Sequence, residues 1–305
     1  HEELEDELAK FLNKEAALVF TTGYQANIGV TTALVGKNDY LILDKFNHAS
    51  ITDGADLAKG SKLYYNHNDM EDLERVLQSV PENSGKIIMI DGVFSMEGDL
   101  CDLPNISELA KKYNARLIVD DAHGVGVIGE AGRGTANHFG LEKETDLIVG
   151  TFSKALASVG GFVAGDKKVI ECIKHFGRSI LFSASLPPAS VASALEALKI
   201  MQEEPQRVTR LNENAEYMRN RLKEFGFNIG HTTTPIVPII VGADMKALTL
   251  WRELLDEGLY VNSVIYPAVA RNQALLRTSY TSEHTREHLD RALDVLCKMK
   301  EKHNF

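Results

Sequence analysis

The chain has 305 residues, of which 44% are hydrophobic and 25% are charged, and its 33 basic and 43 acidic residues give a net charge of −10. This composition is typical of a globular protein with a substantial core, and the length favours two domains. The acidic balance argues against a nucleic-acid-binding surface and against docking on anionic membranes. No apolar run approaches the roughly 20 residues of a membrane helix.

The first 165 residues alternate short apolar runs with amphipathic stretches, starting from a helical pattern at His1–Leu12. Strands are predicted at Ala16–Phe20, Tyr40–Leu43, Lys86–Asp91, Ala115–Asp120 and Asp146–Gly150, with helices at Asp69–Leu77 and Ile106–Tyr113. Buried strands that alternate with helices predict an α/β domain with a mainly parallel sheet.

The pattern changes from Pro187 onward to long helical segments separated by short strands. Helices are predicted at Ala189–Met201, Val208–Phe225, Met245–Glu257 and from His284 to the end, with strands at Ile236–Val241, Tyr260–Asn262 and Leu275–Thr278. This order predicts a smaller α+β domain. We therefore expect a large domain over residues 1–190 and a small C-terminal domain over residues 191–305.

The three cysteines are scattered, without a CxxC pair or a histidine at metal-ligand spacing. They are Cys101, Cys172 and Cys297. This pattern predicts reduced thiols in a cytoplasmic protein and no metal site.

Polar groups follow each predicted strand of the first domain. Thr22 and Gly23 follow the first strand, and Asp120 and His123 stand at the end of a later one, with Lys154 after the last. Singly these are weak signals, because such residues are common in turns, caps and solvated loops. The carboxyl ends of parallel strands share one edge of a sheet, however, so together they indicate a ligand site.

One cofactor, pyridoxal phosphate, requires this combination of groups. Its aldehyde needs a lysine to form an imine. Its ring nitrogen needs a buried carboxylate to remain protonated, so that the ring can accept electrons. Its phosphate needs backbone N–H groups at the start of a helix together with hydroxyl groups.

Several strings, in order and at matching spacings, resemble the α-oxoamine synthase family. They are Thr22–Asn27, Asn47–Ile51 with Asp53–Gly54, His67–Asp69, Gly92–Asp99, Asp120–Gly126 and Gly150–Lys154. Members of this family are fold-type I pyridoxal-phosphate enzymes that condense an amino acid with an acyl-CoA and release CO₂. The resemblance runs from His1 to the last helix, and it implies that a leading segment with substrate-contacting loops precedes His1.

The resemblance implies roles for the residues around the cofactor ring. Lys154 would carry the cofactor as a Schiff base and handle the α-proton of the substrate, and Asp120 would pair with the pyridinium nitrogen. His123 and Ser95 would hydrogen-bond the phenolic oxygen. His48 would stack on the ring, although a histidine at this position could instead only cap the following helix.

The resemblance also implies contacts to the phosphate and the substrate. The phosphate would be held by Thr22, Gly23, Tyr24 and Thr151. Ser183 would reach the phosphate of a neighbouring subunit, which implies a homodimer. Arg277 would bind the carboxylate of a small amino acid through its guanidinium fork, unless it is an unrelated surface arginine.

The specific member of the family stays open. The strings that look most like bacterial serine palmitoyltransferases, which use L-serine and a long-chain acyl-CoA, are Gly258–Asn262, Thr22–Tyr24 and Gly150–Lys154 with Ala157–Gly161. Asn47–Asp53 is equally typical of 8-amino-7-oxononanoate synthase, with L-alanine and a pimeloyl thioester, or of a glycine C-acetyltransferase. Two positions depart from the family: Ala157 stands where many members have glycine, and Ile265 where some serine palmitoyltransferases have a second arginine.

Three alternatives belong to other classes. Gly124–Gly129 satisfies the G-x-G-x-x-G pattern of a nicotinamide dehydrogenase, but a dinucleotide fingerprint opens a helix directly after a strand, and the glycine-rich residues 130–134 do not favour a helix. An aminotransferase of the same fold would need no acyl-CoA. A non-catalytic fragment or partner subunit would be expected to lack Lys154.

Overall fold

The computed structural model describes residues 1–305, which form two compact units. The first unit comprises His1–Phe94 and Cys101–Pro205, and the second comprises Ser95–Leu100 and Gln206–Phe305. The segment Ser95–Leu100 thus belongs with the C-terminal part of the chain, although in sequence it lies between two parts of the first unit. The functional division expected between residues 190 and 191 stays a prediction.

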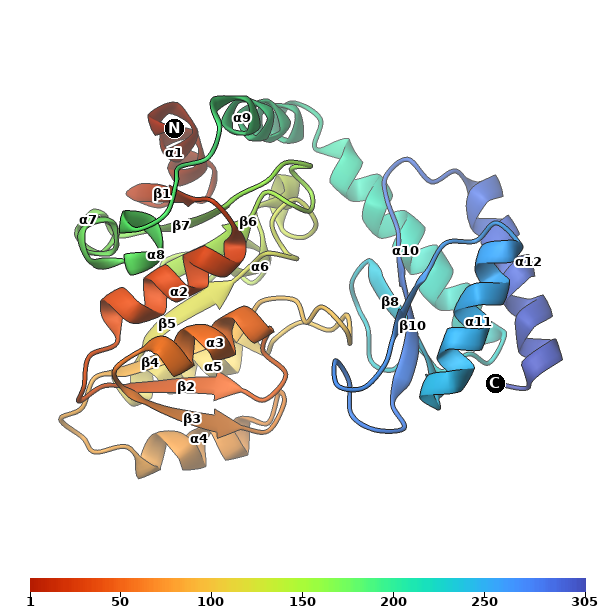
Figure 1. Cartoon of the computed structure of the whole chain (residues 1–305), viewed down its shortest axis with the longest axis horizontal. Coiled ribbons are helices and arrows are strands. Elements are labelled where there is room, and N and C mark those ends of the chain that lie inside the picture. Colours follow the sequence, from red (N-terminus) through yellow and green to blue (C-terminus); the bar gives the residue numbers. More distant parts are fainter. The chain divides into compact units, whose positions relative to one another are not determined.

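The first unit is built on a seven-stranded, mainly parallel sheet (Figure 1). In spatial order its strands are β1 (Ala16–Phe20), β7 (Gly161–Gly165), β6 (Leu147–Thr151), β5 (Arg116–Asp120), β4 (Lys86–Asp91), β2 (Tyr40–Asp44) and β3 (Ser61–Tyr65). Only β7 is antiparallel to its neighbours, β1 and β6. The predicted α/β class with a mainly parallel sheet is confirmed.

Helices cover both faces of this sheet, so the first unit has three layers. On one face pack α2 (Gly23–Leu34), α3 (Ala49–Leu57) and α7 (Lys167–Phe176). On the other face pack α1 (Glu2–Phe11), α4 (Met70–Ser79), α5 (Leu103–Lys112) and α9 (Pro188–Glu203). Shorter turns complete the unit: η1 (Glu130–Gly132), α6 (Thr135–His138) and α8 (Arg178–Leu181). The central strands β4, β6 and β7 are buried along their whole length and are mainly apolar, because helices cover both of their faces.

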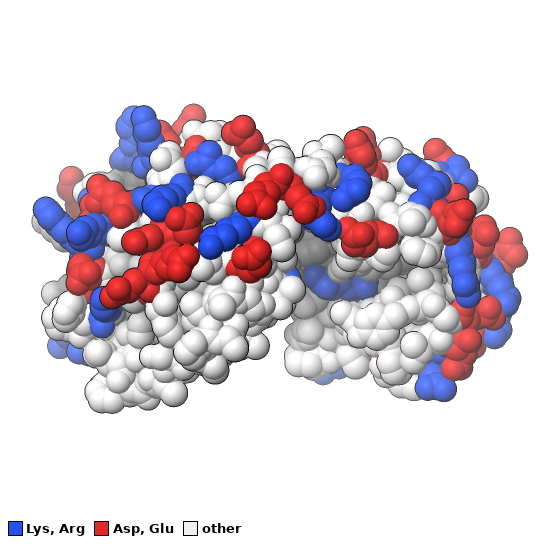
Figure 2. Space-filling model, turned by 90° about the horizontal axis from the view of Figure 1, so that it is seen from above, with Lys and Arg blue, Asp and Glu red and all other residues white.

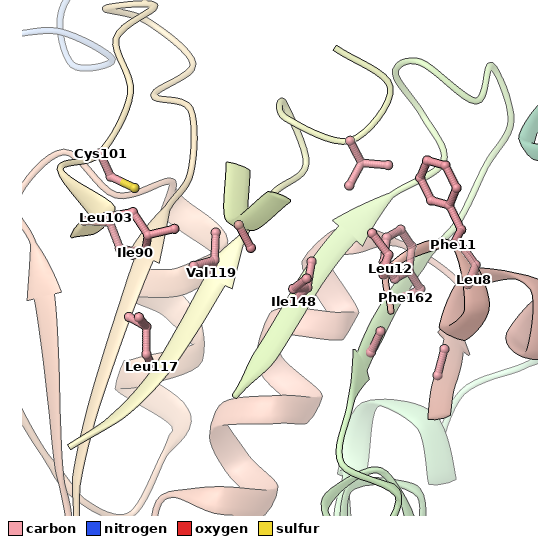
Figure 3. Packing of buried hydrophobic residues seen from close by; sticks show 14 of the residues in the cluster. Leu8, Phe11, Leu12, Ile90, Cys101, Leu103, Leu117, Val119, Ile148 and Phe162 are labelled. Atoms are coloured by element: carbon pink, nitrogen blue, oxygen red, sulfur yellow. The ribbon is translucent and has the colours of Figure 1, made fainter. Parts of the chain in front are cut away.

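Figure 3 shows part of the core on the second of these faces. Leu8 and Phe11 of α1 lie beside Phe162 of β7, and Ile148 of β6 points toward the same layer. Leu8 is fully buried, and burying such a side chain contributes about 2 kcal/mol relative to exposure. The strands that carry predicted site residues at their carboxyl ends are therefore packed against a buried helical layer on this face.

The second unit contains a three-stranded antiparallel sheet in the order β8, β10, β9. The strands are β8 (Ile236–Gly242), β10 (Ala274–Ser279) and β9 (Asn262–Val264), and the helices are α10 (Gln206–Glu224), α11 (Asp244–Asp256) and α12 (Arg286–His303). Apolar side chains of the three helices and the sheet form one separate core. None of the helices in the chain is both long and apolar enough to cross a membrane.

Candidate active site

Asp120 ends β5 and is only 5% exposed. One of its carboxylate oxygens, Oδ1, accepts a hydrogen bond from the Ala122 backbone N–H at 3.1 Å. The other, Oδ2, accepts one from the Asn27 side-chain amide at 2.6 Å. A buried carboxylate needs such partners, and here they also fix the direction in which the carboxylate points.

The N-terminus of α2 begins directly after β1 and lies against the end of β6. Thr22 caps the helix, because its side chain accepts a hydrogen bond from the Gln25 N–H at 3.1 Å. The first turn of α2 contains no acidic residue, so the positive end of the helix dipole is not neutralised locally. A Cβ atom on Gly23 would lie 3.1 Å from Thr151 Cβ, and one on Gly161 would lie 2.5 Å from the Gly23 nitrogen. This close approach requires glycine at Gly161, and at Gly23 it leaves little room for a side chain beside Thr151.

Lys154 lies in the exposed loop that links β6 to β7. The loop is held by Thr151, whose hydroxyl donates to the Gly160 carbonyl at 2.8 Å, and by the Phe152 N–H, which donates to the same carbonyl at 2.9 Å. Ala157 has a φ of 47° in this loop. That left-handed backbone favours glycine by about 1 kcal/mol, which gives a physical reason for the glycine that many family members carry there.

His48 is the N-cap of α3. Its Nδ1 accepts a hydrogen bond from the Ser50 N–H at 3.2 Å and lies 2.7 Å from the Ser50 hydroxyl. The capping role that the sequence left open is thus present in the structure, and it leaves the second ring nitrogen uncommitted by that bond. The His48 N–H donates to Asp91 Oδ2 at 2.6 Å. Burial, followed by the negative charge of Asp120, raises the pKa of Asp91 well above its usual range.

The turn after β5 carries His123, which is partly buried. It follows Asp121, a fully buried carboxylate that accepts hydrogen bonds from the Thr135 N–H and the Thr135 hydroxyl, both at 2.6 Å. Burial raises the pKa of Asp121 to about 6. The following glycines form turns and the 3₁₀ segment Glu130–Gly132, not an α-helix, so Gly124–Gly129 is not a dinucleotide fingerprint.

Tyr24 and Ser183 lie near the start of α2. The Tyr24 hydroxyl donates to Asp53 Oδ2 at 2.7 Å, and this hydrogen bond raises the pKa of Tyr24. The Ser183 hydroxyl accepts from the Gln25 side-chain amide at 3.1 Å. Ser183 therefore contacts a side chain in the first turn of α2 of its own subunit.

Ser95 and Arg277 belong to the second unit, where they contact each other. The Arg277 Nε–H donates to the Ser95 carbonyl at 2.6 Å, and the Arg277 Nη1 donates to the Ser279 hydroxyl at 3.2 Å. No carboxylate acts on the pKa of Arg277, which is lowered by burial alone. A half-buried guanidinium without an acidic partner is suited to binding an anionic ligand.

The first unit thus contains all the other predicted site residues. Most of them lie at or just after the ends of β1, β5 and β6 and at the starts of α2 and α3, whereas Ser183 lies between α8 and α9. Sequence reasoning did not single out Asn27 or Ser50, although both lie within the strings that resemble the family. The sequence pattern could have pointed to Asn27. It is a polar residue four positions after Gly23 and so lies on the same face of a largely apolar helix.

These residues fit pyridoxal phosphate on the chemistry of the donor set. Asp120 offers a buried, oriented carboxylate, and the start of α2 offers backbone N–H groups in a cradle that a Cβ atom on Gly161 would fill. Thr151 adds a hydroxyl beside that cradle, and Lys154 adds an accessible amine. Each part of the cofactor has a matching group within the first unit.

Comparisons with known proteins agree with this geometry. Residues 1–296 match the family model described as aminotransferase class I and II. The chain is 48% identical over 299 residues to a serine palmitoyltransferase of Sphingobacterium spiritivorum, covering 98% of this chain and 75% of that protein. It is also 48% identical over 306 residues to an 8-amino-7-oxononanoate synthase of Thermoanaerobacter pseudethanolicus, covering 100% of this chain and 78% of that protein.

Solved structures are similar over the same range. A serine palmitoyltransferase variant from S. paucimobilis with a bound PLP–myriocin aldimine superposes with a TM-score of 0.96 at 37% identity, covering 98% of this chain and 76% of that one. An 8-amino-7-oxononanoate synthase from Francisella tularensis gives a TM-score of 0.86 at 28% identity, covering 99% and 88%. The predicted resemblance and the predicted cofactor, pyridoxal phosphate, are confirmed. The chain belongs to the aminotransferase class I and II family and, within it, to the α-oxoamine synthases.

Proposed function

We propose that the protein condenses a small amino acid with an acyl-CoA, with loss of CO₂, to form an α-amino ketone. L-Serine and a long-chain acyl-CoA are the proposed substrates. The similarity to serine palmitoyltransferases supports this choice, and a second one, from Bacteroides ovatus, is 50% identical over 298 residues. The observation that carries the proposal is the hydrogen bond between Asn27 and Asp120. It links the carboxylate at the end of β5 to α2, and the start of α2 lies beside Thr151.

The first unit would hold the cofactor, which when bound supplies an electron sink for the carbanion at the substrate Cα. Asp120 would keep the ring nitrogen protonated by placing a negative charge beside it. His48 would stack on the ring, and His123, together with Ser95, would hydrogen-bond the phenolic oxygen. The phosphate would be bound by backbone N–H and hydroxyl groups of Thr22, Gly23, Tyr24 and Thr151.

Lys154 and Arg277 would act on the substrate. The Lys154 Nζ would bind the cofactor between turnovers and, once displaced by the amino acid, would accept and return a proton at the substrate Cα. Arg277 would hold the amino-acid carboxylate. Its partly buried side chain keeps its charge because an arginine pKa lies far above neutral even when burial lowers it.

We also propose a cytoplasmic homodimer that binds no nucleic acid. Exposed apolar side chains support a protein interface at α7, α8 and the residue after α8: Phe176 is 66% exposed, Leu181 52% and Phe182 76%. Ser183 directly follows them and would reach the phosphate site of the neighbouring subunit. Figure 2 shows acidic and basic side chains interspersed on the visible face of each unit, a distribution that offers no basic surface there for nucleic acid.

A second candidate activity is that of 8-amino-7-oxononanoate synthase, which the 48% identity to such an enzyme favours equally. The two are separated by titrating the full-length protein with glycine, L-alanine and L-serine while the cofactor spectrum is recorded. Coupling with acetyl-, pimeloyl- and palmitoyl-CoA then follows. We expect turnover with L-serine and palmitoyl-CoA. Product only from L-alanine with pimeloyl-CoA, or only from glycine with acetyl-CoA, would reject the serine assignment and retain the synthase class. Transamination of a keto acid without acyl-CoA use would reject the class itself.

A further inference from the structure

Asn27 and Ser50 connect two of the proposed cofactor ligands through a chain of hydrogen bonds. The Asn27 side-chain amide donates to Asp120 Oδ2 at 2.6 Å and to the Ser50 hydroxyl at 2.8 Å. The Ser50 hydroxyl in turn lies 2.7 Å from His48 Nδ1. Asn27 is 1% exposed and Ser50 2%, so water does not compete for these bonds.

A close helix crossing brings these side chains together. Asn27 and Thr31 lie one turn apart on α2, and Ser50 and Gly54 lie one turn apart on α3. A Cβ atom on Gly54 would lie 2.7 Å from Thr31 Oγ1 and 3.2 Å from the Asn27 carbonyl oxygen. The glycine therefore permits α3 to approach α2 closely enough for Asn27 and Ser50 to bond.

The chemistry of the groups sets the direction of every hydrogen bond. An ionised Asp120 can only accept, so the amide of Asn27 must present its NH₂ group rather than its oxygen. The Ser50 oxygen accepts one of these N–H groups. The Ser50 backbone N–H donates to His48 Nδ1, which makes this nitrogen an acceptor. A neutral His48 therefore carries its proton on Nε2, and the Ser50 hydroxyl directs its single proton to Nδ1.

We propose that Asn27 and Ser50 are positioning residues, which form a relay that orients the Asp120 carboxylate and fixes His48 as its Nε2–H tautomer. The relay rests on the proposed function insofar as Asp120 and His48 contact the cofactor. Its hydrogen bonds exist in the protein alone, however, so it can be tested without turnover. Neither Asn27 nor Ser50 touches a reacting atom in this scheme.

The test is nitrogen NMR of the His48 ring in the full-length protein, assigned with His48→Gln, with and without pyridoxal phosphate. The wild type should show a protonated Nε2 and an unprotonated Nδ1. Ser50→Ala removes the hydroxyl donor and should increase the fraction of the Nδ1–H tautomer. Asn27→Ala should do the same although Asn27 does not contact His48. Thr32→Val is the matched control, because its hydroxyl bonds only the Ile28 carbonyl within α2.

Cofactor affinity provides the second measurement. Asn27→Ala removes a hydrogen bond to the Asp120 carboxylate and should raise the Kd for pyridoxal phosphate by about 10- to 100-fold. Ser50→Ala keeps that bond and should change the Kd by less than about twofold, which is about 0.4 kcal/mol. An Nδ1–H tautomer in the wild type would overturn the relay, as would Ser50→Ala and Asn27→Ala variants that match Thr32→Val in tautomer. If Asn27→Ala does not fold, the His48 tautomer in Ser50→Ala still tests the relay. Failure of the wild type to bind pyridoxal phosphate on Lys154 would instead reject the proposed function and leave the tautomer result standing.

Discussion

The two units of the chain differ in the kind of sheet they contain and in where their predicted ligand groups lie. The first buries a mainly parallel sheet between two layers of helices, and its predicted site residues lie mainly along the edge where strands end and helices begin. The second has a small antiparallel sheet, and its predicted ligand group, Arg277, projects from the middle of a strand, β10. We therefore predict that the groups that bind the cofactor lie on the first unit, apart from Ser95, and that the second unit binds the substrate carboxylate through Arg277. Variants in the two units should therefore fail in different ways.

Removing the lysine should have the largest effect. Lys154→Ala should fold like the wild type because an exposed loop lysine contributes little packing. It should lose the absorbance of lysine-bound cofactor and all measurable turnover. Borohydride reduction and peptide mapping of the wild type should place the cofactor on Lys154, and label on a different lysine would contradict the assignment of the first unit.

Neutralising the carboxylate of the first unit should slow the chemistry without preventing cofactor binding. In Asp120→Asn the amide has no negative charge to hold the ring nitrogen protonated. Exchange of the substrate α-proton should slow by about two orders of magnitude or more, each factor of ten being about 1.4 kcal/mol in the barrier. The measurement is deuterium exchange at Cα. Near-normal exchange would mean that Asp120 does not face the ring nitrogen.

In the second unit, Arg277→Ala should weaken substrate binding alone. Loss of a charged hydrogen-bond pair should raise the Kd for glycine, L-alanine and L-serine alike, by about 10- to 100-fold. The affinity for pyridoxal phosphate should stay within about twofold, a change of less than 0.5 kcal/mol. Spectral titration with each amino acid gives the first value, and titration of the cofactor-free protein gives the second. A loss of affinity for pyridoxal phosphate in Arg277→Ala would contradict the prediction that Arg277 binds only the substrate.

The sequence predicted the parts of the fold that local pattern determines. β1 and β4 were predicted at their observed bounds, because apolar runs flanked by polar residues mark buried strands. β3 and β7 were not predicted. β3 lies at the edge of the sheet and is half exposed, while β7 begins and ends with glycine, which weakens a strand signal. β9 was expected at Tyr260–Asn262 and is observed at Asn262–Val264.

The site was predictable to the extent that strand ends mark it. Asp120, Thr151 and Lys154 follow directly from strand positions. The bond between Asn27 and Ser50 could not be predicted in the same way, because it depends on how closely two helices cross, and Gly54 sets that distance. The sequence also could not predict that Ser95 belongs to the second unit, because it stands only a few residues after the end of β4, a strand of the first unit.

The smallest expected effect concerns Asp121, which supports the turn beside Asp120. Its pKa is about 6 in the folded protein and about 3.9 in an unfolded chain. A raised acid pKa means that the folded state holds the proton more tightly. The stabilisation is therefore fully present below about pH 4 and is lost as the pH rises through about 6, for a total of about 3 kcal/mol. The unfolding free energy of the wild type minus that of Asp121→Asn, from denaturant titrations at pH 4 to 7, should fall by about that amount. Thr135→Val removes a hydrogen bond that favours the ionised form, so it should move the transition to higher pH. A flat difference across this range would show that Asp121 is ionised throughout and that the Thr135 donors outweigh its burial.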